Sequence, residues 1–212
     1  MQDPIDKKTR VTFTDYVRLM SKGIIYPIAG FFTRIGLSPN MLTLIGLIGN
    51  AVGAYFLARG MITVGGLIIL VMAPLDALDG AMARIIGEKR TDSPGLYGAF
   101  LDSVSDRYAE LFLFGGLLIY YSRLGDWLPV LLAYLAAAGS VLVSYTRARG
   151  QSLGIDTKVG FLTRLERYLI LVPCLIFNIP LIGLWILAVF TNLTALQRIV
   201  DVRYQFSSQK KE

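Results

Sequence analysis

Several stretches of this sequence are apolar over roughly 20 residues, the length that an α-helix needs to cross a lipid bilayer. The clearest covers residues 61–86, MITVGGLIILVMAPLDALDGAMARII, and it contains Asp76, Asp79 and Arg84. The whole chain of 212 residues is 54% hydrophobic and only 17% charged, which is unusual for a soluble domain. We therefore expect an all-α integral membrane protein.

The apolar pattern predicts six transmembrane helices in one compact bundle, with no internal repeat. We divide the chain into residues 1–36, a cytosolic tail and juxtamembrane helix; residues 37–204, a six-helix catalytic domain; and residues 205–212, a C-terminal tail. Ser38, Pro39 and Asn40 give a helix-start signal before the first span. The six apolar runs cover residues 42–57, 61–86, 98–121, 127–146, 165–178 and 180–200.

Residues 13–36 mix apolar and basic side chains, which favours an amphipathic helix in the membrane interface, interrupted at Pro27. Gly49 and Gly53 have the spacing of small residues that lets membrane helices pack closely, and we assign them to packing instead of ligand contact.

The basic residues predict the orientation in the membrane. If the N-terminus is cytosolic, 18 of the 21 Lys and Arg residues fall on the cytosolic side, whereas Arg59 and Arg123 lie outside and Arg107 lies within a span. Such an asymmetry follows the positive-inside rule and places both termini and the Asp76 region at the cytosolic face of the cell membrane. The net charge of +6 suits anionic lipids and phosphorylated substrates, and no free basic domain indicates nucleic acid binding.

Two helical faces carry the chemistry. Asp76, Asp79, Gly80, Ala83 and Arg84 lie at helical offsets of 0, 3, 4, 7 and 8 and so share one face. A carboxylate within a membrane span costs about 2.5 to 3.5 kcal/mol on insertion scales, so this placement indicates function.

A second acidic face begins at Gly98 and continues through Asp102, Asp106 and Glu110 at every fourth residue. If the two faces meet, their carboxylates must be protonated or bind cations. Histidine is absent and Cys174 is the only cysteine, so the usual zinc ligands are missing and no intrachain disulfide can form. Oxygen-rich sites suit Mg²⁺ or Mn²⁺, and two such ions are typical of phosphoryl transfer. We expect Glu110 to pair with Arg107 on the same helix.

The string from Asp76 to Arg84, followed by Gly98, Asp102 and Asp106, resembles the signature DxxDGxxAR, spacer, GxxxDxxxD of the CDP-alcohol phosphotransferase family. All eight signature residues are present. Pro39, Asn40 and Thr43 also resemble the family's first helix. One departure is the spacer of residues 85–97, which has thirteen residues where the family has about eight; we expect it to loop out at Pro94 and Gly95.

The resemblance implies transfer of a phosphatidyl group from a CDP-linked lipid such as CDP-diacylglycerol to an alcohol, with release of CMP. It implies that Asp76, Asp79, Asp102 and Asp106 hold two Mg²⁺ or Mn²⁺ ions, and that Asp106 is also the base for the acceptor hydroxyl. It further implies a homodimer. The residues that it assigns to the CDP-lipid pocket are Asn40, Thr43, Gly80, Ala83, Arg84 and Gly98.

A basic cluster after the fourth span indicates an anionic acceptor. The segments SYTRARGQSLG and RLER resemble the branch of the family that uses inositol phosphate, although Arg147 and Leu165 replace its Lys and Pro. Glycerol phosphate is the alternative acceptor. Each Arg could instead be only a topology anchor. The residues assigned to the acceptor phosphate are Arg147, Arg149, Arg164 and Arg167.

A different class of function, a cation or proton transporter, would also use acidic residues within spans. The small bundle without repeats, and the position of Arg84 beside the acids, favour the enzyme. A structural scaffold would leave the acidic residues unexplained. Assays of CMP release separate these classes.

Overall fold

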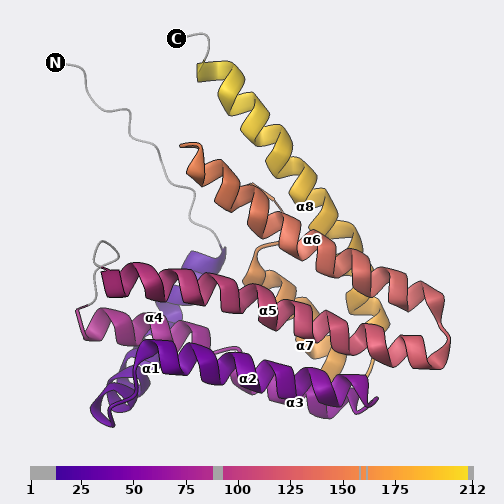
Figure 1. Ribbon diagram of the computed structural model, residues 1–212, viewed down its shortest axis with the longest axis horizontal. Helices are drawn as coiled ribbons and strands as arrows, with labels where there is room; N and C mark the ends of the chain where they lie inside the picture. Colours follow the sequence, from indigo (N-terminus) through magenta and orange to yellow (C-terminus); the bar gives the residue numbers. More distant parts are fainter. Residues whose placement is uncertain (1–12, 88–92, 158, 161, 210–212) are drawn as a thin grey trace.

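The computed structural model describes residues 13–87, 93–157, 159–160 and 162–209, and every regular element in this part of the chain is an α-helix (Figure 1). The helices are α1 (Phe13–Arg34), α2 (Pro39–Ala58), α3 (Ile62–Met72), α4 (Leu75–Ile85), α5 (Ser93–Leu124), α6 (Trp127–Ser152), α7 (Arg164–Ile176) and α8 (Pro180–Gln209).

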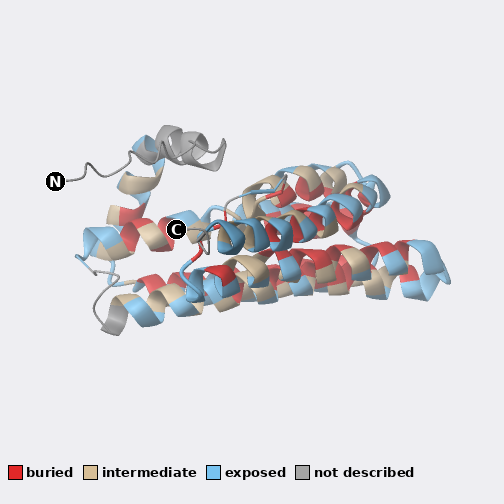
Figure 2. Cartoon of the chain, turned by 90° about the horizontal axis from the view of Figure 1, so that it is seen from above, coloured by how far each residue is buried: buried red, intermediate tan, exposed pale blue. Residues whose placement is uncertain are grey.

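The helices form a bundle in which α2 packs against α5, α3 and α4, while α6 packs against α5 and α8 (Figure 1). The short α7 packs against α3 and α8, and α1 packs against α4. A continuous apolar core joins α2, α3, α5, α6, α7 and α8, with buried residues such as Leu57, Leu117 and Leu184. Figure 2 shows these buried positions on the inward faces of the helices.

Four helical stretches are long and apolar enough to cross a bilayer: Pro39–Ala58, Ile62–Ile85, Trp127–Ser152 and Pro180–Ser208. They correspond to the first, second, fourth and sixth predicted spans. The third and fifth predicted spans are helical but are not among these four: α5 contains several charged residues, and α7 has only 13 residues. At 1.5 Å per residue α7 is about 20 Å long, shorter than the hydrocarbon core of roughly 30 Å.

Two predicted features in the middle of the chain differ from the structure. The second apolar run is divided between α3 and α4 at Ala73 and Pro74, because proline has no N–H group and its ring crowds the preceding turn. The spacer does not loop out at residues 93–97, since these residues form the first turns of α5; residues 88–92 lie outside the described part of the chain.

The ends of the chain also differ in detail from the prediction. Helix α1 continues through Pro27 without interruption. Helix α8 extends to Gln209, so part of the predicted tail is helical. The predicted start of the first span is confirmed, because the Ser38 side chain accepts a hydrogen bond of 3.2 Å from the Met41 N–H and Pro39 begins α2.

Close contacts at glycines hold α2, α3 and α5 together. A Cβ atom at Gly53 would lie 3.3 Å from the Gly65 carbonyl oxygen, and one at Gly116 would lie 2.5 Å from the Ala54 carbonyl oxygen. A Cβ at Gly49 would lie 2.1 Å from Met72 Sδ. The assignment of Gly49 and Gly53 to helix packing is confirmed, and Gly116 extends the same principle to the contact between α2 and α5.

Candidate active site

The two acidic faces meet where α4 and α5 approach each other at one end of the bundle. Carboxylate oxygens of Asp76, Asp102 and Asp106 all lie within 4.8 Å of one another. None of these three side chains is fully buried. The convergence follows from the helical spacing, since Asp102 and Asp106 are one turn apart on α5 and Asp76 lies in the first turn of α4.

Asp79 lies beside this cluster and is bound to α2. Its Oδ2 atom accepts a hydrogen bond of 2.6 Å from the Thr43 hydroxyl, and both residues are buried. The Thr43 hydroxyl also lies 3.2 Å from the Pro39 carbonyl oxygen. Thr43 therefore fixes the orientation of an acidic side chain instead of standing free in a pocket.

Arg164 places its guanidinium directly in the acidic cluster. Its Nη1 atom lies 2.5 Å from Asp76 Oδ2 and 2.5 Å from Asp106 Oδ1. The guanidinium also lies over the ring of Tyr168, 5.2 Å from its centre. A second cation, Arg107, is 3.7 Å from Asp106 Oδ2 and donates a hydrogen bond to the Ser103 carbonyl oxygen.

The expected pairing of Glu110 with Arg107 is wrong. Glu110 Oε1 instead accepts hydrogen bonds from Arg167 Nη2 at 2.6 Å and Nε at 3.1 Å. Arg167 Nη1 also donates to the Leu162 carbonyl oxygen at 3.3 Å. The reason is burial: Glu110 faces α7 inside the bundle, whereas Arg107 turns toward Asp106 and the partly exposed end.

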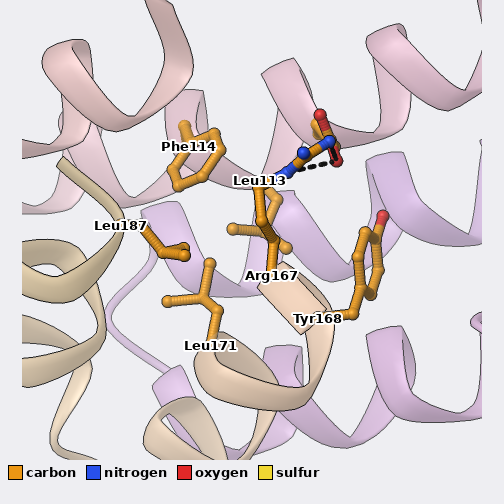
Figure 3. A pocket seen from close by; sticks show the side chains of 7 residues that line it. Leu113, Phe114, Arg167, Tyr168, Leu171 and Leu187 are labelled. Atoms are coloured by element: carbon orange, nitrogen blue, oxygen red, sulfur yellow. Dashed lines mark hydrogen bonds and ion pairs between the residues drawn. The ribbon is translucent and has the colours of Figure 1, made fainter. Parts of the chain in front are cut away.

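The Glu110–Arg167 pair lines a small cavity together with apolar side chains of α5, α7 and α8, among them Phe114, Leu171 and Leu187 (Figure 3). The cavity volume is about 10 Å³, close to the minimum for one water molecule. Since the Arg167 side chain is 4% exposed and bound to Glu110, the structure does not offer it to a soluble acceptor.

Residues assigned to the CDP-lipid pocket lie around the same end of the bundle. A Cβ at Gly98 would be 3.3 Å from Asn40 Oδ1, and one at Gly80 would be 3.9 Å from an Arg84 guanidinium nitrogen. Arg84 Nε donates a hydrogen bond of 3.1 Å to the hydroxyl of Tyr26, a residue of α1 that the sequence did not single out. Ala83 is half-buried on α4.

The other basic residues assigned to the acceptor are not in the acidic cluster. Arg147 Nε lies 3.8 Å from Asp156 Oδ1, and Arg149 donates a hydrogen bond of 3.3 Å to the Ser152 hydroxyl. Arg198, which the sequence pattern assigned only to topology, is buried and donates to the carbonyl oxygens of Val159 and Val143. Arg198 therefore ties the segment before α7 to α6.

The donor set fits a hard divalent cation. Asp76, Asp102 and Asp106 offer only carboxylate oxygens, the ligands that Mg²⁺ and Mn²⁺ prefer. The guanidinium of Arg164 between two of these carboxylates shows that the cluster holds positive charge at this place. A partly exposed acidic cluster of this kind, at one end of a bundle of apolar helices, is typical of a membrane enzyme that uses divalent metal ions.

The family profile of CDP-alcohol phosphatidyltransferases matches residues 36–196, and the chain belongs to this family. Phosphatidylinositol phosphate synthase of Streptomyces avermitilis is 38% identical to it over 205 aligned positions, which cover 89% of this chain and 81% of that protein. Archaetidylinositol phosphate synthase of Pyrococcus horikoshii is 33% identical over 171 positions, covering 80% of this chain and 85% of that protein.

Solved structures agree with these similarities. Phosphatidylinositol phosphate synthase of Mycobacterium tuberculosis with CDP-DAG bound is 29% identical, with a TM-score of 0.77 over 85% of this chain and 94% of that one. The same enzyme in complex with manganese and citrate has a TM-score of 0.78, covering 84% of this chain and 88% of that one. The chain is therefore an integral membrane phosphatidyltransferase of phospholipid biosynthesis that uses divalent metal.

Proposed function

We propose that this enzyme transfers the phosphatidyl group of CDP-diacylglycerol to a hydroxyl of inositol phosphate and releases CMP. The observation that carries the proposal is the contact between Arg164 and the acidic cluster, because it puts a phosphate-binding side chain beside the carboxylates. Relatives in Streptomyces, Mycobacterium and Pyrococcus that bear the name of an inositol phosphate lipid synthase support the choice of acceptor.

Asp76, Asp79, Asp102 and Asp106 would hold two divalent ions, Mg²⁺ or Mn²⁺. When bound, these ions would offset the charge that develops on the departing CMP and help to orient the attack. Thr43 would hold Asp79 in a fixed orientation through its hydrogen bond. The manganese complex of the Mycobacterium tuberculosis enzyme supports a metal of this type.

Asp106 would accept the proton of the acceptor hydroxyl on its carboxylate, whose Oδ1 atom contacts Arg164. The donor would lie over Gly80 and Gly98, where the absence of a side chain leaves room for the nucleotide, with Asn40, Thr43 and Ala83 nearby. Arg84, held by Tyr26, would contact the diphosphate.

The acceptor phosphate would bind Arg164, with Arg147 and Arg149 at the outer side of the site. Both of these have weak partners that a phosphate could replace, at 3.8 Å and 3.3 Å. Arg167 was assigned to the same role from the sequence, but its pairing with Glu110 favours a structural role.

We further propose six spans preceded by an interfacial α1, both termini and the active site at the cytosolic face of the cell membrane, and a homodimer. The end of the bundle that holds the acidic cluster also holds Arg84, Arg147 and Arg164, whereas Arg59 caps the far end of α2 and Arg123 donates a hydrogen bond to the Ala58 carbonyl oxygen there. This separation of charge supports the orientation. Cysteine labelling at residues 59 and 149 in intact cells, and cross-linking in membranes, test these points.

The activity is tested by incubating purified protein with CDP-diacylglycerol and Mg²⁺ and measuring CMP release with inositol phosphate, glycerol phosphate, inositol or no acceptor. We expect release with inositol phosphate alone, and a lipid product that carries two phosphates. Release with glycerol phosphate alone would assign the alternative acceptor. Absence of CMP with every acceptor would instead favour a transporter. A CDP-linked ether lipid in the same assay decides between diacyl and ether donors.

A further inference from the structure

Arg164 lies where a cation shared by two acidic helices would lie. One nitrogen, Nη1, is equally distant from Asp76 Oδ2 on α4 and Asp106 Oδ1 on α5, at 2.5 Å from each. Divalent ions such as Mg²⁺ bind carboxylate oxygen at roughly 2.0 to 2.1 Å. An ion bridging the same two oxygens would therefore overlap with Nη1, and the two cannot be present together.

We infer that Arg164 is a tethered competitor for the metal site, and that the acceptor phosphate relieves the competition by drawing Arg164 away. The inference rests on the proposed function, because it takes Asp76 and Asp106 as metal ligands. It adds an order of binding to the reaction: the metal site becomes fully available only after the acceptor's phosphate, or another anion of this type, has bound the guanidinium of Arg164.

The surroundings of Arg164 allow this exchange. Its side chain is 27% exposed, so a phosphate from solution can reach it. Its Nε atom is buried and has no hydrogen-bond partner in the described part of the chain, so this donor gains a partner when the guanidinium moves toward a phosphate oxygen. The ring of Tyr168 gives the guanidinium a face to rest on, with 5.2 Å between the charge and the ring centre.

Arg107 provides a comparison on the same carboxylate. It also carries a positive charge near Asp106, but at 3.7 Å from Oδ2, and its Nη1 atom donates a hydrogen bond to the Ser103 carbonyl oxygen of its own helix. Its effect on a metal ion would be electrostatic repulsion alone. Arg164 adds direct exclusion, because it uses the same oxygen atoms as the ion.

The test is a Mn²⁺ binding titration on the detergent-purified protein without CDP-lipid, read by electron paramagnetic resonance of the free ion. We expect Arg164→Gln to bind Mn²⁺ about tenfold more tightly than the native protein, the lower end of what a charge-assisted hydrogen bond is worth. The matched control Arg107→Gln should tighten binding by less than about threefold, in line with a weak surface ion pair. Equal affinities of the native protein and Arg164→Gln would overturn the inference.

The second arm measures coupling. Inositol phosphate, and separately inorganic phosphate, should tighten Mn²⁺ binding to the native protein and to Arg107→Gln but not to Arg164→Gln; a titration without protein corrects for Mn²⁺ bound by free phosphate. Because linkage is reciprocal, Mn²⁺ should tighten phosphate binding by the same factor. The same coupling in Arg164→Gln as in the native protein would contradict the inference.

The titration separates this inference from the proposed function. If Asp102→Asn loses Mn²⁺ binding, the ion is in the acidic cluster. The two arms above then decide whether Arg164 competes with it. If neither the native protein nor Arg164→Gln binds Mn²⁺, the metal site itself is refuted. Thermal unfolding of each variant shows whether a change in affinity comes from a change in fold.

Discussion

Two arginines on α7, three residues apart, meet two acidic residues on α5, four residues apart, yet the two contacts have different characters. Arg167 and Glu110 are 4% and 5% exposed, and each satisfies the other inside the bundle. Arg164 and Asp106 are 27% and 16% exposed, and Arg164 is shared with Asp76 beside a third carboxylate. The first contact is a closed pair, and the second is an open cluster with more negative than positive charge.

The difference shows that one pair of helices can carry both a fixed structural ion pair and a site whose cation can be exchanged. A buried pair is costly to break, because removing one partner leaves the other charge without compensation. A partly exposed cluster with surplus carboxylates can exchange its cation, because water and ligands can reach it. Position along the helices, one turn deeper or one turn nearer the surface, decides which role a charged residue has.

The sharpest test compares two isosteric changes one turn apart on α5. Asp106→Asn should lower CMP release by about 10²- to 10⁴-fold, because the amide cannot accept the acceptor's proton. Binding of CDP-diacylglycerol and thermal stability should remain near native. Glu110→Gln should have the opposite effect: thermal stability should fall, but the protein that remains folded should keep its activity. Normal turnover by Asp106→Asn would refute its role as base.

The closed pair can be broken on one side or removed altogether. Arg167→Met should destabilise the folded protein by about 3 to 5 kcal/mol, because Glu110 then remains buried without a partner. The double variant Glu110→Leu with Arg167→Met should recover much of this loss, since no charge is left buried. Thermal unfolding in detergent measures both. A double variant less stable than Arg167→Met would contradict the proposed cause.

A smaller effect is expected at Thr43. This residue is buried, like the Glu110–Arg167 pair, but it contacts Asp79, a residue of the candidate site. Thr43→Val keeps the shape of the side chain and removes the hydrogen bond to Asp79, which is worth about 1.5 to 3 kcal/mol for a charged acceptor. We expect Mn²⁺ to bind about tenfold more weakly. Thr43→Ser, which keeps the hydroxyl, serves as the control and should bind Mn²⁺ almost as the native protein does.

The smallest effect is expected at Tyr26, which holds Arg84 by an exposed hydrogen bond of 3.1 Å. Tyr26→Phe keeps the ring, 5.7 Å from the Arg84 charge, and removes only the hydroxyl. An exposed contact of this kind contributes below about 1 kcal/mol, so KM for CDP-diacylglycerol should rise by no more than about fivefold. A larger rise in KM would show that the Tyr26–Arg84 contact contributes as much as a buried ion pair such as Glu110–Arg167.

The sequence predicted the features that depend on local spacing. Helical periodicity placed Asp76 on one helical face and Asp102 with Asp106 on another, and the structure shows that these two faces meet; Ser38 with Pro39 marked the start of α2. The break before α4 follows from Pro74, although the hydropathy pattern continues across it. The helical turn over residues 93–97 was missed, because Pro94 and Gly95 indicate a turn but are also tolerated in the first turn of a helix.

Partners far apart in the sequence could not be predicted. Glu110 has Arg107 nearby on its own helix, but it pairs with Arg167, 57 residues later in the chain. The contact of Thr43 with Asp79 and the insertion of Arg164 into the acidic cluster likewise depend on how the helices pack. Periodicity gives the face of a helix, but the neighbour of that face is decided by the tertiary fold.

The glycine contacts of α2 have a consequence for how acceptor preference can change. Gly116 leaves α5 against the backbone of α2 at Ala54, and Gly53 does the same for α2 and α3 at Gly65, so α2, α3 and α5 are closely packed. Helix α7 is short; its C-terminal end packs closely on α3, where a Cβ at Gly66 would lie 3.2 Å from the Ile176 backbone nitrogen, and its N-terminal end reaches the acidic cluster through Arg164. If the acceptor phosphate binds Arg164 as proposed, new acceptor specificities can arise from changes in the first turn of this short helix and in the segment before it, while the packing of α2, α3 and α5 is kept.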